Sequence, residues 1–169
     1  MSHPPYTQLL AIKQWADRGL YDAVRRQFDQ LSNEDATLML RILDHVHTVD
    51  RIFQHHLQGL PHPFAAPRSE KLPELSTLAQ HAQQVDDWYV SYAQTVTQAK
   101  LDEPLEFTFT SGKQARMRRG EILLHVCLHG TYHRGNAGAL LQLRGLTPSR
   151  DAITDFLEDT ASAPPLAFS

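Results

Sequence analysis

The sequence predicts an all-α protein, built as a four-helix bundle with a short irregular or β-hairpin insert before the last long helix. Four segments of about 25 residues each repeat apolar side chains at steps of three and four, which is the spacing of one face of an α-helix. Helices and strands do not alternate along the chain, and no internal repeat is visible, which favours a helical bundle over an α/β fold. The 169 residues are enough for one domain with a real core and too few to expect two.

The first two helices are predicted over residues 6–31 and from about residue 32 to residue 58. Ser32 or Asn33 can accept hydrogen bonds from the free N–H groups at the start of the second helix. Gly59 and the prolines after it end this helix and predict a loop over residues 59–73. The second helix has the most regular spacing, and we expect its buried stripe to consist of Leu38, Ile42, His45, Val49, Ile52 and His56.

The third helix is predicted from near Ser76 to about Lys100, and the fourth from about Arg119 to Arg144. The fourth is apolar almost all round, so we expect it to be the most buried. Between them, "LEFTFTSGK" (residues 105–113) alternates apolar and polar side chains before a Ser-Gly turn, which predicts a strand or hairpin. The segment "SRDAITDFLE" (149–158) is expected to add one short helix. We place the single domain at residues 1–160 and a loosely held tail at 161–169.

Charge and cysteine usage exclude several classes of function. The net charge of −3 gives no electrostatic footprint for nucleic acid. The one basic cluster, "KQARMRR" (113–119), is interpreted as a solvated segment that leads into a helix, with a site for an anionic small molecule as the alternative. The acidic residues of "EDAT" (34–37), together with Asp86 and Asp87, are interpreted as solvated helix charges. The single cysteine, Cys127, fits a reducing compartment, and without a signal peptide or an apolar run of membrane length we expect a cytoplasmic protein that does not enter a membrane.

The segment "HGTYHRG" (129–135) contains the chemistry that the sequence singles out. On a helix, His129 and His133 lie about 40° apart around the axis and about 6 Å apart along it, so that both can face one ion. A metal site needs at least one more ligand. His45 lies on the predicted buried stripe, where an imidazole without a partner would cost about 1–3 kcal/mol. The three histidines are therefore candidate metal ligands, and the alternative is that they are half-buried polar helix residues.

Other residues near this segment are assigned to different roles. His125 continues the same row, but it lies about 12 Å along the axis from His133, so it cannot share the ion with both of the others. Asn136 points within about 20° of the direction of His129 and could contact or orient a ligand of the metal. His125 and Asn136 are thus the candidate catalytic residues. Arg134 is expected to pair with an acidic residue on another helix, such as Asp50. His56 is about 16 Å along the second helix from His45 and is expected to lie elsewhere. The other histidines off the stripes or in loops are interpreted as surface residues: His47, His55, His62 and His81.

Two segments resemble the DinB-like proteins, a superfamily of small bacterial helical bundles. They are "ILDHVHTVDRIFQHHLQG" (42–59) and "EILLHVCLHGTYHRGNAGALLQLRG" (121–145). The resemblance implies an up-down-down-up bundle, often dimeric, in which His45, His129 and His133 bind one divalent metal. It places Asp50 and Arg51 in the family's aspartate-arginine positions. Phe53 stands where the family usually has tryptophan, and Asn136 where it usually has glutamine.

Family members with known activity include metal-dependent thiol S-transferases and a thiol-dependent isomerase. The first hypothesis is therefore an enzyme that uses zinc, nickel, iron or manganese to activate a low-molecular-weight thiol for transfer to a small electrophile. The segment 113–119 is a candidate contact for the carboxylates of that thiol. The alternatives are metal-dependent hydrolysis of a small substrate, and a metal-binding stress-response homodimer without turnover.

Overall fold

The computed structural model describes residues 4–161, and it is predominantly helical, as the sequence predicts. Its long helices are α1 (Pro4–Gln27), α2 (Asn33–Gln58), α3 (Leu75–Thr95) and α5 (Arg119–Leu143). The shorter elements are the 3-10 turn η1 (Phe28–Gln30), the helices α4 (Gln98–Asp102) and α6 (Ile153–Ala161), and the strands β1 (Pro104–Thr108) and β2 (Gln114–Arg118). The expected short helix after residue 148 is therefore present as α6. The predicted tail lies outside the described residues, apart from Ala161.

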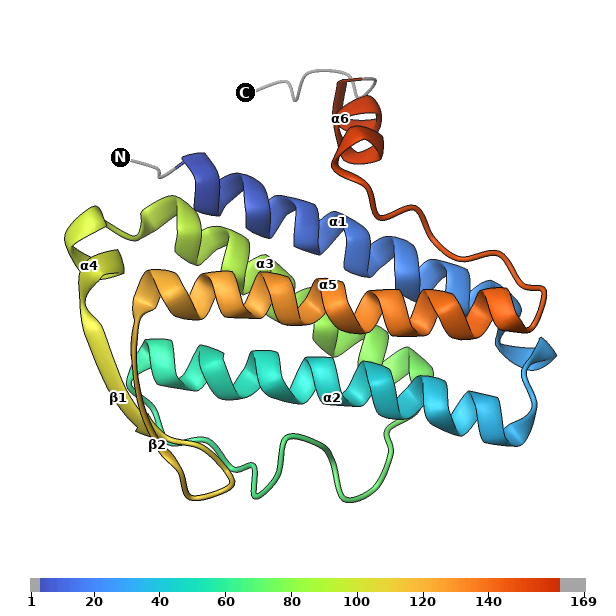
Figure 1. The fold of residues 1–169 in the computed structure, drawn as a ribbon, viewed down its shortest axis with the longest axis horizontal. Helices are drawn as coiled ribbons and strands as arrows, with labels where there is room; N and C mark the ends of the chain where they lie inside the picture. Colours follow the sequence, from blue (N-terminus) through green and yellow to red (C-terminus); the bar gives the residue numbers. More distant parts are fainter. Residues whose placement is uncertain (1–3, 162–169) are drawn as a thin grey trace.

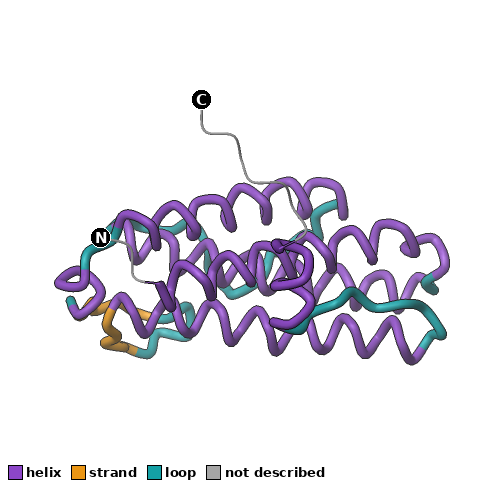
Figure 2. Tube along the Cα trace, turned by 90° about the horizontal axis from the view of Figure 1, so that it is seen from above, coloured by secondary structure: helices purple, strands orange, loops and turns teal. Residues whose placement is uncertain are grey.

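The long helices run side by side (Figure 1), α1 and α5 in one direction and α2 and α3 in the other. Each of α1 and α2 packs against both α3 and α5. The α1/α3 pair therefore lies on the opposite side of the bundle from the α2/α5 pair. The hairpin covers one end of the bundle (Figure 2). Within residues 4–161, no helix is both long enough and apolar enough to span a membrane.

Local chemistry explains where the elements begin and end. The Oγ of Ser32 accepts a hydrogen bond from the backbone N–H of Asp35 at 3.1 Å and starts α2, as predicted. Gly59 ends that helix in the left-handed region, with φ of 69°. The third helix ends at Thr95 rather than near residue 100, because Val96 is extended and Thr97 caps the separate helix α4.

The predicted hairpin is confirmed. Strands β1 and β2 pair antiparallel, with Leu105 opposite Met117 and Phe107 opposite Ala115. Gly112 allows the turn between them, with φ of 84°. Most of the basic segment 113–119 is thus strand β2, which leads directly into α5.

Burial in α2 and α5 differs from the expectation. In α2, Val49 and Ile52 are buried as predicted, but Leu38 is 47% exposed. The most buried apolar residues of α2 are Met39, Leu43, Phe53 and Leu57. Apolar residues occupy adjacent rows at 38–39 and 42–43, so the spacing alone does not decide which row faces the core. In α5, Leu128 is 70% exposed, so this helix is not buried all round.

Two apolar clusters form the core, and a layer of charged side chains separates them. Along α1, Leu10 belongs to one cluster and Leu20 to the other. Along α5, Cys127 belongs to the first and Ala137 to the second. The burial expected for Cys127 is confirmed. The charged layer consists of the residues Lys13, Asp17, Asp50, Asp86 and Arg134, each of which is 5% exposed or less.

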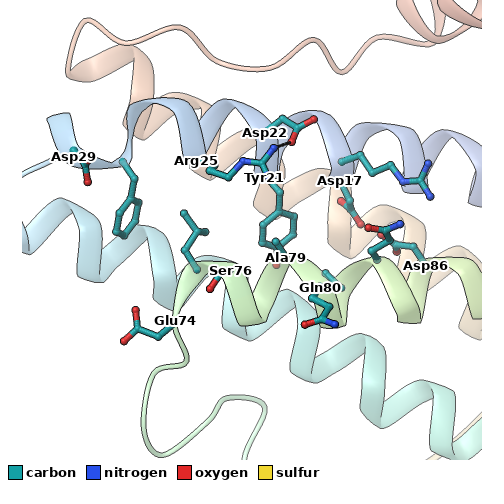
Figure 3. Close-up of a pocket in the computed structure, with 15 residues that line it drawn as sticks. Asp17, Tyr21, Asp22, Arg25, Asp29, Glu74, Ser76, Ala79, Gln80 and Asp86 are labelled. Atoms are coloured by element: carbon teal, nitrogen blue, oxygen red, sulfur yellow. Dashed lines mark hydrogen bonds and ion pairs between the residues drawn. The ribbon is translucent and has the colours of Figure 1, made fainter.

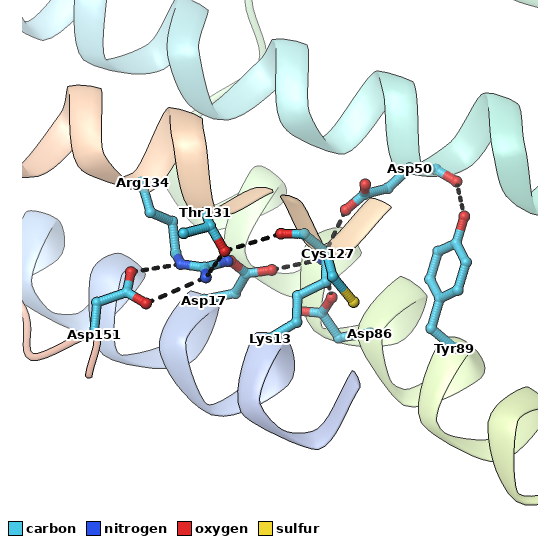
Figure 4. Close-up of polar contacts among 9 residues, drawn as sticks. All are labelled: Lys13, Asp17, Asp50, Asp86, Tyr89, Cys127, Thr131, Arg134 and Asp151. Carbon is cyan, nitrogen blue, oxygen red and sulfur yellow. Dashed lines mark hydrogen bonds and ion pairs between the residues drawn. The ribbon is translucent and has the colours of Figure 1, made fainter. Parts of the chain in front are cut away.

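Lys13 is the centre of this charged layer (Figure 4). Its Nζ lies 2.7 Å from a carboxylate oxygen of Asp17, 2.8 Å from Asp50 and 2.6 Å from Asp86. Arg134 binds Asp17 at 2.9 Å and Asp151 at 2.7 Å. Arg134 therefore pairs with an acidic residue on another helix, as expected, but that residue is Asp17 rather than Asp50, which binds Lys13.

Two of these carboxyl groups keep raised pKa values despite the ammonium group beside them. Burial raises the pKa of Asp50 to about 6 and that of Asp86 well above its usual range. The interpretation of Asp86 as a solvated charge is wrong, because it is 3% exposed, whereas Asp87 and Glu34 are exposed as expected. It is also wrong for Asp35, which is 7% exposed and binds Arg144 at 2.8 Å. The sequence around Asp86 gave no sign of this burial, because Lys13, the cation that binds Asp86, lies on another helix.

Replacing Lys13 with methionine should destabilise the protein by about 3–5 kcal/mol, because it leaves buried carboxylates without their cation. Urea denaturation at pH 7.5 measures the change. The matched control is Lys100→Met, since the Lys100–Glu103 ion pair is 59% and 39% exposed and should contribute little. Similar losses in the two variants would contradict this account of the charged layer.

Candidate metal centre

The structure brings together the three histidines that the sequence singles out. His45 comes from α2, while His129 and His133 come from consecutive turns of α5. One ring nitrogen from each lies within 4.8 Å of the other two. The ring centroids are 4.9 Å apart for His45 and His129, 4.7 Å for His45 and His133, and 4.5 Å for His129 and His133.

The spacing of the ring nitrogens fits a common metal ion. The Nε2 atoms of His45 and His129 are 3.1 Å apart. Two nitrogens bound to one ion at about 2.0–2.1 Å would be separated by roughly 2.9 Å at a right angle and roughly 3.4 Å at a tetrahedral angle. In addition, Nδ1 of His129 is buried and has no hydrogen-bond partner among the described residues. The polar atoms of this cluster are thus incompletely satisfied by the protein alone.

A backbone carbonyl sets the tautomer of His45. The Nδ1 atom of His45 lies 2.7 Å from the carbonyl oxygen of Pro67. Because a carbonyl oxygen can only accept, Nδ1 carries the proton, and Nε2 is left with a free lone pair that faces His129. Metal-binding histidines commonly use their second nitrogen in this way.

Asp44 holds the loop that provides this carbonyl. Its buried carboxylate accepts hydrogen bonds from the backbone N–H of Ser69 at 2.8 Å and from the Oγ of Ser69 at 2.6 Å. These two bonds tie the loop to α2 next to His45. Sequence reasoning missed both Asp44 and Pro67. Neighbours on a helix point about 100° apart, so the position of Asp44 beside His45 in the chain was no signal of a shared role.

The environment of the cluster favours neutral imidazoles, which is the form that binds metals. Burial, together with the nearby rings of His133 and His45, lowers the pKa of His129 to about 3. Burial and the ring of His45 also lower the pKa of His133. At neutral pH, His129 and His133 are therefore uncharged and have lone pairs available.

The two candidate catalytic residues lie at the edge of the cluster. The ring of His125 stacks on that of His129, with centroids 5.5 Å apart, and also contacts Phe53 at 4.9 Å. The Nδ2 atom of Asn136 is 3.5 Å from Nδ1 of His133. His125 and Asn136 are both exposed, so both can meet a molecule that approaches from solvent.

The other positions of the resemblance serve packing and the charged layer. Asp50 binds Lys13, and the guanidinium of Arg51 lies over the ring of Phe64, 5.8 Å from its centroid. His56 lies away from His45, as expected, and stacks on Phe107 with centroids 4.4 Å apart. His81 is exposed as expected, but His47, His55 and His62 are half-buried, because the loop after α2 packs over this helix or they face its neighbours.

A separate pocket of about 800 Å³ lies between α1 and α3 (Figure 3), on the side of the bundle away from the histidines. It borders Asp17 and Asp86 of the charged layer. Some of its other charged groups pair with each other, as Asp22 and Arg25 do at 2.6 Å. None of the three histidines lines it.

The metal-free protein should lose stability as the pH falls from about 6.5 toward about 3. In this window the unfolded chain binds a proton at His129 and the folded chain does not, so acid favours unfolding. Asp50 acts in the opposite sense, because its raised pKa makes the folded chain bind a proton more readily between 3.8 and about 6. His129→Gln should therefore weaken the loss of stability on acidification, measured by urea denaturation at pH 7.5 and 5.

The control for this prediction is His81→Gln, because His81 is exposed. The dependence should be reduced rather than abolished in His129→Gln, since burial also lowers the pKa of His47, to about 4. An unchanged pH dependence in His129→Gln would contradict the assignment of a neutral, buried imidazole at this position.

Comparison with known proteins identifies the family and a similar fold. The sequence pattern of the DinB family matches residues 1–165. The chain is 24% identical to the protein DinB of Bacillus subtilis over 140 residues, which is 78% of this chain and 81% of that protein. Its fold is similar to that of a DinB-like protein from Bacillus cereus, with a TM-score of 0.66, 16% identity, and coverage of 88% of this chain and 97% of the other. A matching pattern over nearly the whole length shows that this chain belongs to the DinB family.

Proposed function

We propose that the protein binds one divalent metal ion through His45, His129 and His133, and that it is an enzyme that transfers a low-molecular-weight thiol to a small electrophile. The observation that carries the proposal is the convergence of three imidazoles, from two helices, within 4.8 Å. Three protein ligands leave coordination positions open, as in catalytic sites, whereas structural zinc sites usually have four protein ligands. Zinc, nickel, iron and manganese all accept imidazole, so the donor set does not select among them.

The attacking sulfur would come from the cosubstrate. Cys127 is the only cysteine, it is buried, and burial raises the pKa of its thiol to about 12. It is therefore unsuited to act as a nucleophile at neutral pH. A divalent ion, when bound, would lower the pKa of a coordinated thiol so that the thiolate is available near neutral pH.

Residues at the edge of the cluster supply the remaining roles in the proposal. The thiol sulfur forms the new bond to the electrophilic carbon, the leaving group departs with the electrons of the broken bond, and the thiol proton is released. His125 is exposed beside His129 and is the proposed acceptor of that proton. Asn136 contacts His133 and is the proposed group that orients the bound molecule.

The basic segment 113–119 is a poor contact for the carboxylates of the thiol. It enters α5 at Arg119, which is about 15 Å along the helix axis from His129. Arg119 is also engaged, because it donates hydrogen bonds to Glu103 at 3.2 Å and to the carbonyl oxygen of Leu57 at 2.6 Å. The contact for the carboxylates of the thiol is therefore expected elsewhere in the site.

Two other functions remain as alternatives, with the same ligands. In the first, the open coordination positions activate water, and the protein hydrolyses a small substrate. In the second, the ion fastens α2 to α5 in a stress-response homodimer that has no turnover. The exposed apolar residues Leu128 and Tyr132, one turn apart on the outer face of α5, favour a homodimer. An up-down-down-up bundle in the cytoplasm completes the proposal, and the helix directions in Figure 1 support the connection order.

Removing any one of the three histidines should abolish tight metal binding. His45→Ala, His129→Ala and His133→Ala each leave two imidazoles, which are too few to hold an ion firmly. Elemental analysis of purified protein and titration with zinc measure the loss. His81→Ala should retain the metal content of the parent, because His81 is exposed and outside the cluster. Equal metal content in all four variants and the parent would overturn the assignment.

The metal-loaded protein should consume a low-molecular-weight thiol in the presence of an electrophile, and His133→Ala should not. The assay follows free thiol with bacillithiol, mycothiol or glutathione against a panel of small electrophiles. Ester or amide hydrolysis without thiol consumption would favour the hydrolase. Bound metal with neither activity would favour the dimer without turnover.

A further inference from the structure

We infer that the substrate of the three-histidine site carries a carboxylate, held by Arg41 and Arg68, beside an apolar portion that lies in a groove between α2 and α5. The inference rests on the proposed function only for where the reacting group lies. The anion site itself is argued from the residues around His45.

Two depressions meet at His45. The first has a volume of about 500 Å³ and the second about 370 Å³, and Arg41 and His45 line both. Volumes of this size are typical of sites for small molecules. The first depression also contains His133 and Asn136, so it opens directly onto the proposed metal ligands.

Antiparallel packing explains why the larger depression lies on one side of the histidines. From His133, α5 continues to Leu140 and Leu143, while α2 runs back from His45 to Leu38. These residues make the groove mainly apolar. Leu38 and Leu143 are 47% and 76% exposed, so the groove presents apolar surface that a bound molecule could cover.

Arg41 and Arg68 are placed at the edge of this groove by different elements. Arg41 lies one turn before His45 on α2, so the two side chains are neighbours on the same helix face. Arg68 directly follows Pro67, whose carbonyl oxygen is 2.7 Å from Nδ1 of His45. The bonds between Asp44 and Ser69 fix this part of the loop.

Neither arginine has an acidic partner among residues 4–161, in contrast to Arg18, Arg119, Arg134, Arg144 and Arg150, which bind carboxylates. Asp44 lines the same depression, but its oxygens accept the two hydrogen bonds from Ser69. The guanidinium groups of Arg41 and Arg68 line the smaller depression, and a guanidinium group matches the planar, two-oxygen geometry of a carboxylate. The acidic end would therefore lie near the loop, the apolar part in the groove, and the reacting group beside His45 and His133.

The test compares thiols that differ in charge. Cobalt-loaded protein is titrated at pH 8 with 3-mercaptopropionate and with 2-mercaptoethanol, and binding is followed by the thiolate-to-metal absorption band. We expect at least tenfold tighter binding of the anionic thiol. The double variant Arg41→Ala/Arg68→Ala should lose this preference and bind 2-mercaptoethanol as the parent does. Arg118→Ala, an exposed arginine on β2, should keep the preference.

A second measurement separates this inference from the proposed function. Metal-free protein is titrated with 3-phenylpropionate, which has a carboxylate and an apolar ring but no thiol, and binding is followed by NMR chemical shifts. Binding that depends on Arg41 and Arg68 supports the anion site even if the protein holds no metal. If the protein binds cobalt but does not distinguish the two thiols, or if the double variant weakens both equally, the inference is overturned and the metal site stands. If Arg118→Ala removes the preference instead, the anion site belongs to the hairpin.

Discussion

The arrangement of the bundle depends on the buried ion pairs that the ammonium group of Lys13 forms with Asp17, Asp50 and Asp86. Lys13 and Asp17 belong to α1, Asp50 to α2, Asp86 to α3, and Arg134 to α5, so one connected set of charges joins all of the long helices. A buried charge must lie within hydrogen-bond distance of its partners, whereas apolar side chains tolerate sliding. The layer therefore fixes how α2 and α5 are placed along each other. Arg134 directly follows His133 in the chain, so the same contact positions the turn that carries a proposed ligand.

Sequence spacing predicted the helices well because each of them must bury one face. It also predicted the hairpin and the convergence of His45 with His129 and His133. It failed where two rows of apolar residues lie side by side, as at Leu38 and Met39, because the choice between them depends on what packs above. It also failed for Asp86, since the cation that makes its burial tolerable lies 73 residues away, on another helix.

The support around the histidines was not predictable, because it depends on tertiary structure. Asp44 acts through Ser69, which is 25 residues away in a loop rich in proline. Arg41 and Arg68 line the same depression only because that loop folds back along α2. The basic segment 113–119 was a candidate anion contact because its charges lie close together in the sequence, yet it ends at Arg119, about 15 Å along the axis of α5 from His129. Arg41 and Arg68, which the fold brings to the same depression, are therefore better candidates for the anion contact than the basic segment 113–119.

The hydrogen bond from His45 to the main chain at position 67 has a consequence for how this site can change over evolutionary time. Every amino acid has the same carbonyl group, so the residue there can vary while the imidazole keeps its protonation pattern. The constraint is transferred to Asp44, whose side chain holds Ser69, two residues after Pro67. Residue 67, the hydrogen-bond partner of His45, would then be free to vary among relatives. The position under constraint would be residue 44, directly before the histidine.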